Sequence, residues 1–151
     1  MNEVLIELIG RLRERMPELS LIDEDYGQLE TDAGDQYPVT FPCVLLSGLT
    51  VQWEEMGAMP ANIQRGTAEM TVRLGIDCYD DTHAGSGTTD RIADRARLLR
   101  RLTDCLHGYR PRGSLEPVKR TRSRPATTAY GVKVYETTYR WRMTERLAET
   151  S

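Results

Sequence analysis

Residues 67–79 alternate between apolar and polar side chains over their whole length. Because neighbouring side chains of a β-strand point to opposite faces, this alternation predicts a long strand with one buried face and one face in water. The buried face would carry Ala68, Met70, Val72, Leu74, Ile76 and Cys78. A strand of this length buries its apolar face only inside a sheet that another layer covers. We therefore expect the chain to fold around a sheet.

Two other segments have the spacing of amphipathic helices. In residues 2–16 apolar side chains recur every four residues, and Pro17 follows directly and ends the helix. A second helix is predicted by the stripe of Ile92, Ala96, Leu99, Leu102 and Leu106. Thr88 or Thr89 is its expected N-cap, and Gly108 follows its last turn.

The first half of the chain contains shorter strand signals separated by polar segments. We expect a short strand at residues 19–22 and a long, exposed, acidic loop at residues 23–36. Residues 41–46 are apolar and predict a strand, and we expect strand pairing to resume at residues 51–53. Residues 54–66 are rich in glycine and small residues, which indicates a projecting arm.

The last third returns to strand patterns. Residues 115–122 form a weaker candidate, and residues 130–143 form a long one whose apolar positions change parity, which suggests a β-bulge. The order of helix, strands, helix and strands favours an α+β fold, with a mainly antiparallel sheet packed against two amphipathic helices. We expect one domain over residues 1–146 and a short polar tail at residues 147–151.

The composition narrows the class of protein. A chain of 151 residues with 39% apolar residues fills one core more easily than two. It contains no apolar run of the roughly 20 residues that cross a bilayer, and its first residues, with Glu3 and Glu7, lack the pattern of a signal peptide. Three widely spaced cysteines within apolar runs indicate buried, reduced thiols: Cys43, Cys78 and Cys105.

Motifs for catalysis or for metal binding are weak. Residues 85–87 read Gly-Ser-Gly between a strand and a helix, but the Gly-Lys-Ser/Thr ending of a phosphate-binding loop is missing, so a flexible turn is favoured. His83 lies near Asp80 and Asp81 without a second His or Cys at ligand spacing, which favours a solvated loop over a metal site. His107 ends the second helix and is interpreted as a helix-end feature. We expect no catalytic residue, no metal and no cofactor.

Charge is distributed unevenly along the chain. The net charge is -3, but residues 1–107 carry -9 and residues 108–151 carry +6. The clearest basic run is Lys119, Arg120, Arg122 and Arg124, and we expect the three arginines to project from one side of a strand. Such a row can be a solvated edge that blocks aggregation, a subunit interface or a contact with nucleic-acid phosphates. The acidic candidates for an interface are Asp23, Glu24, Asp25, Glu54 and Glu55.

Several segments together give the chain a recognisable order. A short first helix precedes Phe-Pro-Cys-Val-Leu-Leu at residues 41–46, and the long strand ends in Asp-Cys-Tyr at residues 77–79. The helical residues 98–106 and a closing strand, Tyr-Glu-Thr-Thr-Tyr-Arg-Trp at residues 135–141, follow. In the order and the residue patterns of these segments, over about residues 1–146, the chain resembles the phage tail terminator family of minor tail proteins.

The resemblance implies a structural protein of a phage or prophage, without catalysis. Members of such a family form a ring, usually of six copies, that docks on the last layer of the tail tube, stops its polymerisation and offers its other face to the head connector. The expected partners are other copies of the chain, the tail tube protein and the head-completion protein, with DNA only passing through the ring. Assembly would take place in the host cytoplasm, before incorporation into the virion tail.

Two other functions stay open on the sequence alone. A nucleic-acid-binding module would use the basic run near the carboxy terminus, although the rest of the chain is acidic. A small hydrolase or metal enzyme would need clustered catalytic residues, which the sequence pattern does not indicate.

Overall fold

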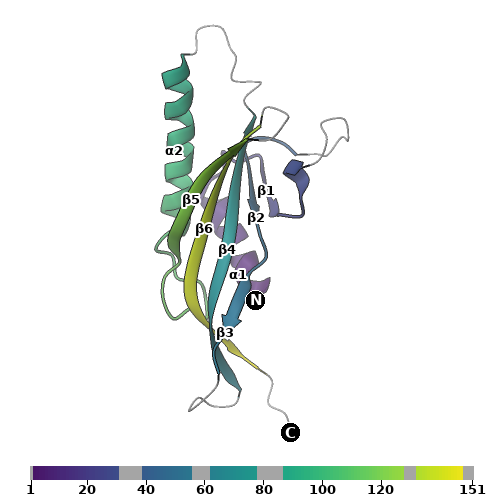
Figure 1. Cartoon of the computed structure of the whole chain (residues 1–151), viewed down its shortest axis with the longest axis vertical. Helices are drawn as coiled ribbons and strands as arrows, with labels where there is room; N and C mark the ends of the chain where they lie inside the picture. The colour runs from purple at the N-terminus through teal and green to yellow at the C-terminus, as the bar shows by residue number, and fades with distance from the viewer. Residues whose placement is uncertain (1, 31–38, 56–61, 78–86, 128–131, 148–151) are drawn as a thin grey trace.

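The computed structural model describes residues 2–30, 39–55, 62–77, 87–127 and 132–147 (Figure 1). Within them, two α-helices, one 3-10 helix (η1) and six strands follow one another along the chain. Their order is α1 (Asn2–Arg15), β1 (Leu21–Glu24), η1 (Gln28–Glu30), β2 (Cys43–Leu46), β3 (Thr50–Trp53), β4 (Ile63–Asp77), α2 (Thr88–Leu106), β5 (Lys119–Thr127) and β6 (Val132–Arg146). No described helix is long and apolar enough to cross a membrane.

All six strands belong to one sheet, in the order β1-β2-β4-β6-β5, with β3 paired to the first half of β4. The β4 and β6 strands pair along their full length, from Ile63 opposite Arg146 to Asp77 opposite Val132. The pair of β1 and β2 is parallel and the other pairs are antiparallel. The predicted α+β class with a mainly antiparallel sheet is therefore confirmed.

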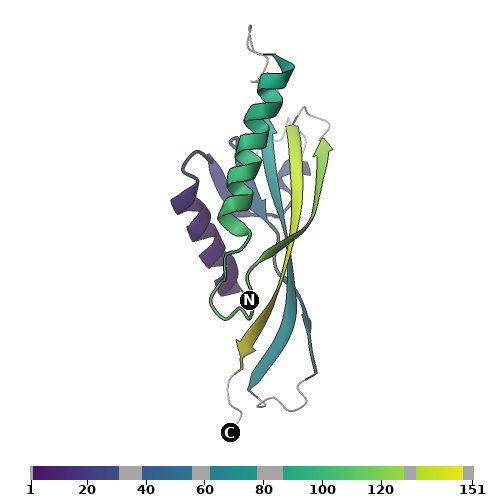
Figure 2. The ribbon, with the colours of Figure 1, turned by 90° about the vertical axis from the view of Figure 1, so that its left-hand side faces the viewer.

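Both helices pack on the same face of the sheet (Figure 2). The apolar stripe of α1 is buried there, together with the last two turns of α2 and the apolar face of β4. Fully buried aromatic residues of β6, Tyr139 and Trp141, fill the centre of this core. Burying each such large side chain contributes about 1.5–3 kcal/mol, so this layer dominates the stability of the fold.

The first half of α2 is far less buried than its sequence pattern predicts. Ile92 is 53% exposed, and the buried residues of this helix are Leu102, Cys105 and Leu106, all near its end. Figure 2 shows why, because the N-terminal turns of α2 extend beyond the end of the sheet. The helix begins at Thr88 with Gly87 as N-cap and no side-chain cap, so the predicted capping by a threonine is wrong.

A second, smaller cluster lies on the opposite face of the sheet. Leu29 of η1 covers Cys43, Leu45 and Val134 there. A Cβ atom on Gly75 would lie 2.9 Å from the Cys43 Sγ, so this close layer needs a glycine in β4. Val134 and Tyr139 are thus buried on opposite faces, although β6 pairs with β4 without any register shift. The bulge predicted in residues 130–143 is wrong, because both faces of β6 are covered.

Two predicted loops are shorter than expected. Strand β1 continues through Asp23 and Glu24, because both residues pair with β2, so the acidic loop predicted from residue 23 begins later. Strand β4 starts at Ile63, and the Glu54 amide donates to the Arg65 carbonyl at 2.8 Å, so residues 63–66 do not belong to a projecting arm.

The strand predicted at residues 115–122 lies further along the chain than expected. The candidate at residues 115–122 corresponds to β5, which starts at Lys119 and continues to Thr127. Cys43 and Cys105 are free and buried, as predicted, whereas Cys78 lies outside the described residues. So do the loop that contains His83, Asp80 and Asp81 and most of the predicted tail.

Candidate interaction surfaces

The basic strand β5 does not present its arginines on one side. A β-bulge shifts the register between Arg120 and Arg122, so that Arg120 lies opposite Tyr139 whereas Arg122 lies opposite Thr138. One extra residue in a strand moves every later side chain to the other face. Arg120 therefore points toward α2, where its Nη1 donates to the Thr103 Oγ1 at 3.3 Å. Arg122 and Arg124 lie on the opposite face, and the predicted single row is wrong.

Arg124 takes part in an ion-pair network on that opposite face. Its Nε donates to Glu136 Oε2 at 2.7 Å, and Glu136 Oε1 lies 3.5 Å from the Nε of Arg73. Arg73 also pairs with Asp25, at 3.3 Å, and with Glu30. Burial alone would lower the pKa of Arg73, but the hydrogen bonds and charges of Glu30 and Asp25 raise it above its ordinary value. Arg73 thus links Asp25 and the η1 residue Glu30 to the sheet, and both Asp25 and Arg124 are paired within one chain.

Other predicted interface residues are also paired within the chain. Lys119 Nζ lies 3.2 Å from Glu116 Oε2, and Glu54 pairs with Arg142. Asp23 accepts a hydrogen bond from the amide of the next residue at 2.8 Å. Of the predicted interface residues, those that form no ion pair with another described residue are Asp23, Glu24, Glu55, Arg120 and Arg122. The charges are therefore more intermixed than the division along the sequence suggests.

The two edges of the sheet nevertheless have opposite charge. Residues 18–30, which include the β1 edge, hold five Asp or Glu and no Lys or Arg. The other edge is β5, where residues 119–127 contain four basic residues and no acidic one. Strand order alone places these segments at the two ends of the sheet, on opposite sides in Figure 1. The sequence contains both charged segments but not their placement.

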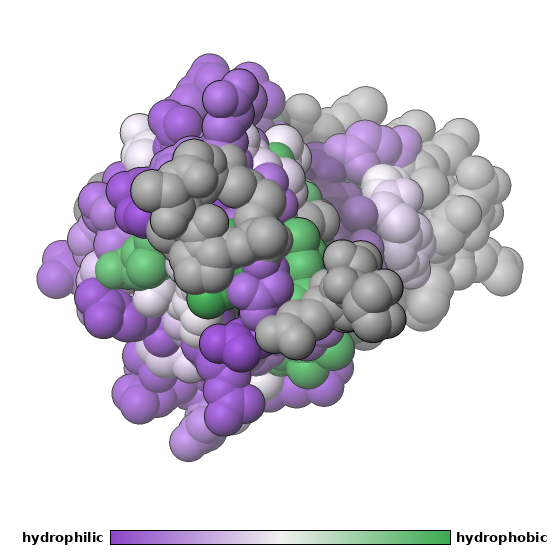
Figure 3. All heavy atoms as spheres, turned by 90° about the horizontal axis from the view of Figure 1, so that it is seen from below, coloured by the Kyte–Doolittle hydropathy of each residue, from purple (hydrophilic) through white to green (hydrophobic). Residues whose placement is uncertain are grey.

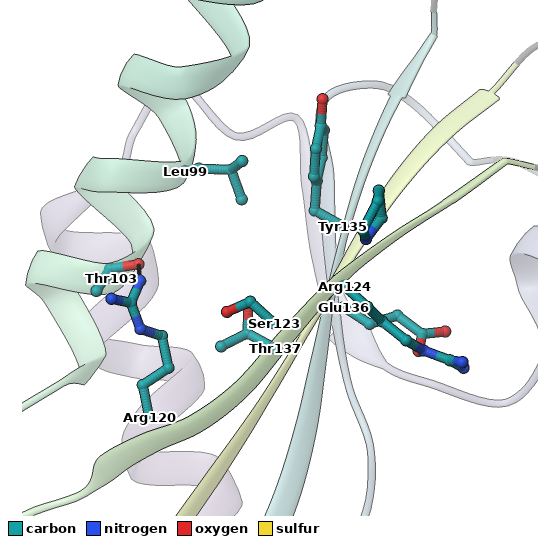
Figure 4. Close-up of a pocket in the computed structure, with 9 residues that line it drawn as sticks. Leu99, Thr103, Arg120, Ser123, Arg124, Tyr135, Glu136 and Thr137 are labelled. Atoms are coloured by element: carbon teal, nitrogen blue, oxygen red, sulfur yellow. Dashed lines mark hydrogen bonds and ion pairs between the residues drawn. The ribbon is translucent and has the colours of Figure 1, made fainter.

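A hollow of about 240 Å³ lies between α2 and the basic edge. Figure 4 shows Leu99 and Thr103 of α2 facing Tyr135, Ser123 and Thr137 across it, while Arg124 and Glu136 point to the other side of the sheet. Its full lining is Leu99, Thr103, Arg120, Ser123, Arg124, Pro125, Tyr135, Glu136 and Thr137. Sequence reasoning missed this hollow, because it forms only where α2 diverges from the sheet.

Large exposed apolar side chains are scattered over different elements. They are Ile6, Tyr26, Ile92, Leu115 and Leu147. Seen from the β3 end, the described surface is mostly hydrophilic with small apolar areas between the polar ones (Figure 3). Single exposed apolar residues are normal in folded domains. Such a residue therefore indicates a contact with a partner only where it lies beside a hollow or a charged surface.

The described residues form no arrangement typical of catalysis. No group of three or more His, Cys, Asp or Glu among them could hold a metal ion. Burial raises the pKa of Cys43 to about 11 and also raises the pKa of Cys105, so both thiols stay protonated at neutral pH. His107 is the C-cap residue of α2, and its Nδ1 accepts the Arg120 amide at 3.0 Å, which links the helix end to β5.

Comparisons with known proteins agree with this architecture. A family model described as phage tail terminator protein matches residues 5–149. No curated protein sequence matches significantly, whereas 22 chains of solved structures do. One of them belongs to the virion of a native gene transfer agent particle; it has a TM-score of 0.56 and 15% sequence identity, and the match covers 91% of each chain. At that identity the likeness shows a shared fold.

The family match extends over all six strands of the sheet, the whole of α2 and all of α1 except its first three residues. It therefore includes both charged edges and the hollow beside α2. The chain belongs to the phage tail terminator protein family and is a structural protein of the phage tail.

Proposed function

We propose that copies of this chain join head to tail into a closed ring, of six copies by analogy with the family, that caps the tail tube. The ring ends polymerisation of the tube on one face and meets the head-completion protein on the other. DNA passes through its opening, and no covalent bond is made or broken. Assembly takes place in the host cytoplasm before the ring enters the virion.

The observation that supports this proposal is the opposite charge of the two sheet edges. A contact between different surfaces of identical subunits leaves one of each surface free, and such contacts close into rings when the rotation between subunits allows it. The acidic β1 edge and the basic β5 edge are two such surfaces. Because most of these charges are exposed, they contribute register and association rate more than affinity.

The residues proposed for this contact follow from the edges. On the basic side they are Lys119, Arg120, Arg122 and Arg124, and on the acidic side Asp23, Glu24 and Asp25. Glu54 and Glu55 follow β3 at the far end of the sheet, so we assign them to a second contact, with the tail tube or the next subunit.

Two measurements test the ring and the cap separately. Native mass spectrometry in low salt, at tens of micromolar chain, should show a closed oligomer, alone or after addition of tail tube protein. Electron microscopy should then show tubes of defined length with a ring at one end, where tube protein alone continues to polymerise. A strictly monomeric chain under both conditions, with tubes that keep growing, would rule the proposal out.

A further inference from the structure

We propose that Tyr26 of one copy inserts into the hollow between α2 and β5 of the next copy and forms the apolar centre of the ring contact. This inference rests on the ring proposed above and specifies which side chains meet. The occupant is a second copy of the same chain, and the argument depends on the turn that holds Tyr26, on the charges beside the hollow and on the register of the sheet.

The turn that carries Tyr26 is rigidly built, although the side chain itself is 65% exposed. The side chain of Gln28 is buried; its Oε1 accepts the Tyr26 amide at 2.8 Å, and its Nε2 donates to the Glu24 carbonyl at 2.8 Å. Gly27 has a φ of +96° and donates its amide to Asp25 Oδ1 at 3.0 Å. An aromatic side chain on such a turn loses little conformational freedom on binding.

The hollow has the complementary chemistry. Its walls include the apolar side chains of Leu99 and Pro125 and the ring of Tyr135. Two guanidinium groups lie beside it: Arg95 Nε donates to the Tyr135 hydroxyl at 3.0 Å, and Arg120 Nη1 donates to the Thr103 Oγ1. Within the described part of the chain, neither arginine pairs with a carboxylate.

These two arginines favour an aromatic side chain that carries acidic neighbours. A guanidinium stacks on an aromatic face and pairs with carboxylates. Tyr26 lies within three residues of Asp23 and Glu24, neither of which forms an ion pair with a described residue. The turn therefore brings an aromatic ring together with negative charge, which the two guanidinium groups beside the hollow can balance.

The register places the two surfaces at the same level of the sheet. Asp23 lies opposite Leu45, which lies opposite Arg73, and this row continues through Glu136 to Arg124. The end of β1 and the part of β5 that lines the hollow thus share one row of residues at opposite edges. If the ring axis runs roughly along the strands, the acidic edge of one copy meets the hollow of the next without a shift along the axis (Figure 1).

The first experiment removes the aromatic ring. Tyr26→Ala should weaken association between copies by about 30-fold or more, which is typical of truncating a central aromatic residue, measured by sedimentation velocity or native mass spectrometry. Tyr26→Phe keeps the ring and should retain association. Ile6→Ala is the matched control, because Ile6 is 70% exposed on α1 and belongs neither to the Tyr26 turn nor to the lining of the hollow.

A mixing experiment tests the head-to-tail arrangement directly. Ser123 is an exposed residue of β5 that lines the hollow, so the larger side chain of Ser123→Trp should fill the hollow while Tyr26 stays in place. Each variant alone should fail to form rings. An equal mixture of Tyr26→Ala and Ser123→Trp should form heterodimers and nothing larger, because one intact hollow and one intact tyrosine meet once. Circular dichroism of each variant checks that the fold is kept.

The outcomes separate this inference from the ring itself. If rings assemble on free chain or on tail tubes and Tyr26→Ala leaves them unchanged, the contact proposed here is wrong and the ring stands. If the mixture of variants gives no heterodimer although both are folded, the contact is also wrong. If the wild-type chain forms no oligomer alone or on tubes, both proposals fail.

Discussion

Replacing Arg73 by methionine tests whether the charged network holds the η1 turn on the sheet. The Arg73 side chain is 13% exposed, and it contacts the carboxylates of Asp25, Glu30 and Glu136. The substitution keeps much of the apolar stem but removes the positive charge between three negative groups. Glu136 keeps Arg124 as a partner, whereas Asp25 and Glu30 have no other ion pair among the described residues.

The expected loss follows from the burial of these groups. Removing one partner of a fully buried pair costs about 3–5 kcal/mol, and removing one partner of an exposed pair costs about 0–1 kcal/mol. Because Arg73 and Asp25 are only 13% and 15% exposed, we expect a decrease of about 3 kcal/mol in the free energy of unfolding at pH 7. For a chain of this size that corresponds to a decrease in Tm of roughly 6–12 °C.

Urea unfolding at pH 7, followed by circular dichroism, measures this loss. Arg122→Met is the matched control, since its side chain is exposed on β5 without an ion pair among the described residues, and it should change stability by less than about 0.5 kcal/mol. Equal effects of the two substitutions at pH 7 would refute the role of the network.

Three further predictions concern the packing and the buried titratable groups of the fold. Gly66→Ala should destabilise the fold by about 1–3 kcal/mol in urea unfolding, because a Cβ atom there would lie 2.7 Å from the Trp53 ring, whereas Gly10→Ala, with open space around it, should stabilise α1 by about 0.5–1 kcal/mol; the reverse order would contradict the packing. Burial raises the pKa of Tyr139 to about 12, above its value in the unfolded chain, so the stability that the neutral phenol contributes is complete below pH 10 and is lost between pH 10 and 12. Tyr139→Phe should reduce this alkaline loss of stability, and an unchanged dependence of stability on pH would contradict the role of the buried hydroxyl. The buried Cys43 thiol should resist iodoacetamide at pH 8 until the chain unfolds in urea, and rapid labelling of the folded chain, located by peptide mass spectrometry, would show that this face is open.

Local periodicity predicted most of the secondary structure. The alternation along residues 67–77 corresponds to β4, and the stripe that begins at Val4 corresponds to α1. Such patterns depend only on the repeat of a strand or a helix, which neighbouring residues determine among themselves. The end of α2 at Gly108, which has a φ of +87°, was predictable for the same reason.

Patterns that looked alike locally had different outcomes in three dimensions. The stripe of α2 continues to Ile92, but only its last turns are buried, because the rest of the helix extends beyond the sheet. The parity change in β6 was interpreted as a bulge, yet it arises because η1 covers the far face around Val134. The true bulge lies in β5, where the alternating arginines suggested a regular strand.

The sequence by itself determined the α+β class, the main helices and strands and the uneven distribution of charge. Only the tertiary structure decided that the acidic segment and the basic segment lie at opposite edges of one sheet and that Asp23 and Arg124 share one row of residues across it. The physical reason is that strand order and register depend on contacts between residues far apart in the chain, such as Arg73 with Asp25. A single extra residue in β5, which no periodicity indicates, is enough to turn Arg120 toward the helix and Arg122 away from it.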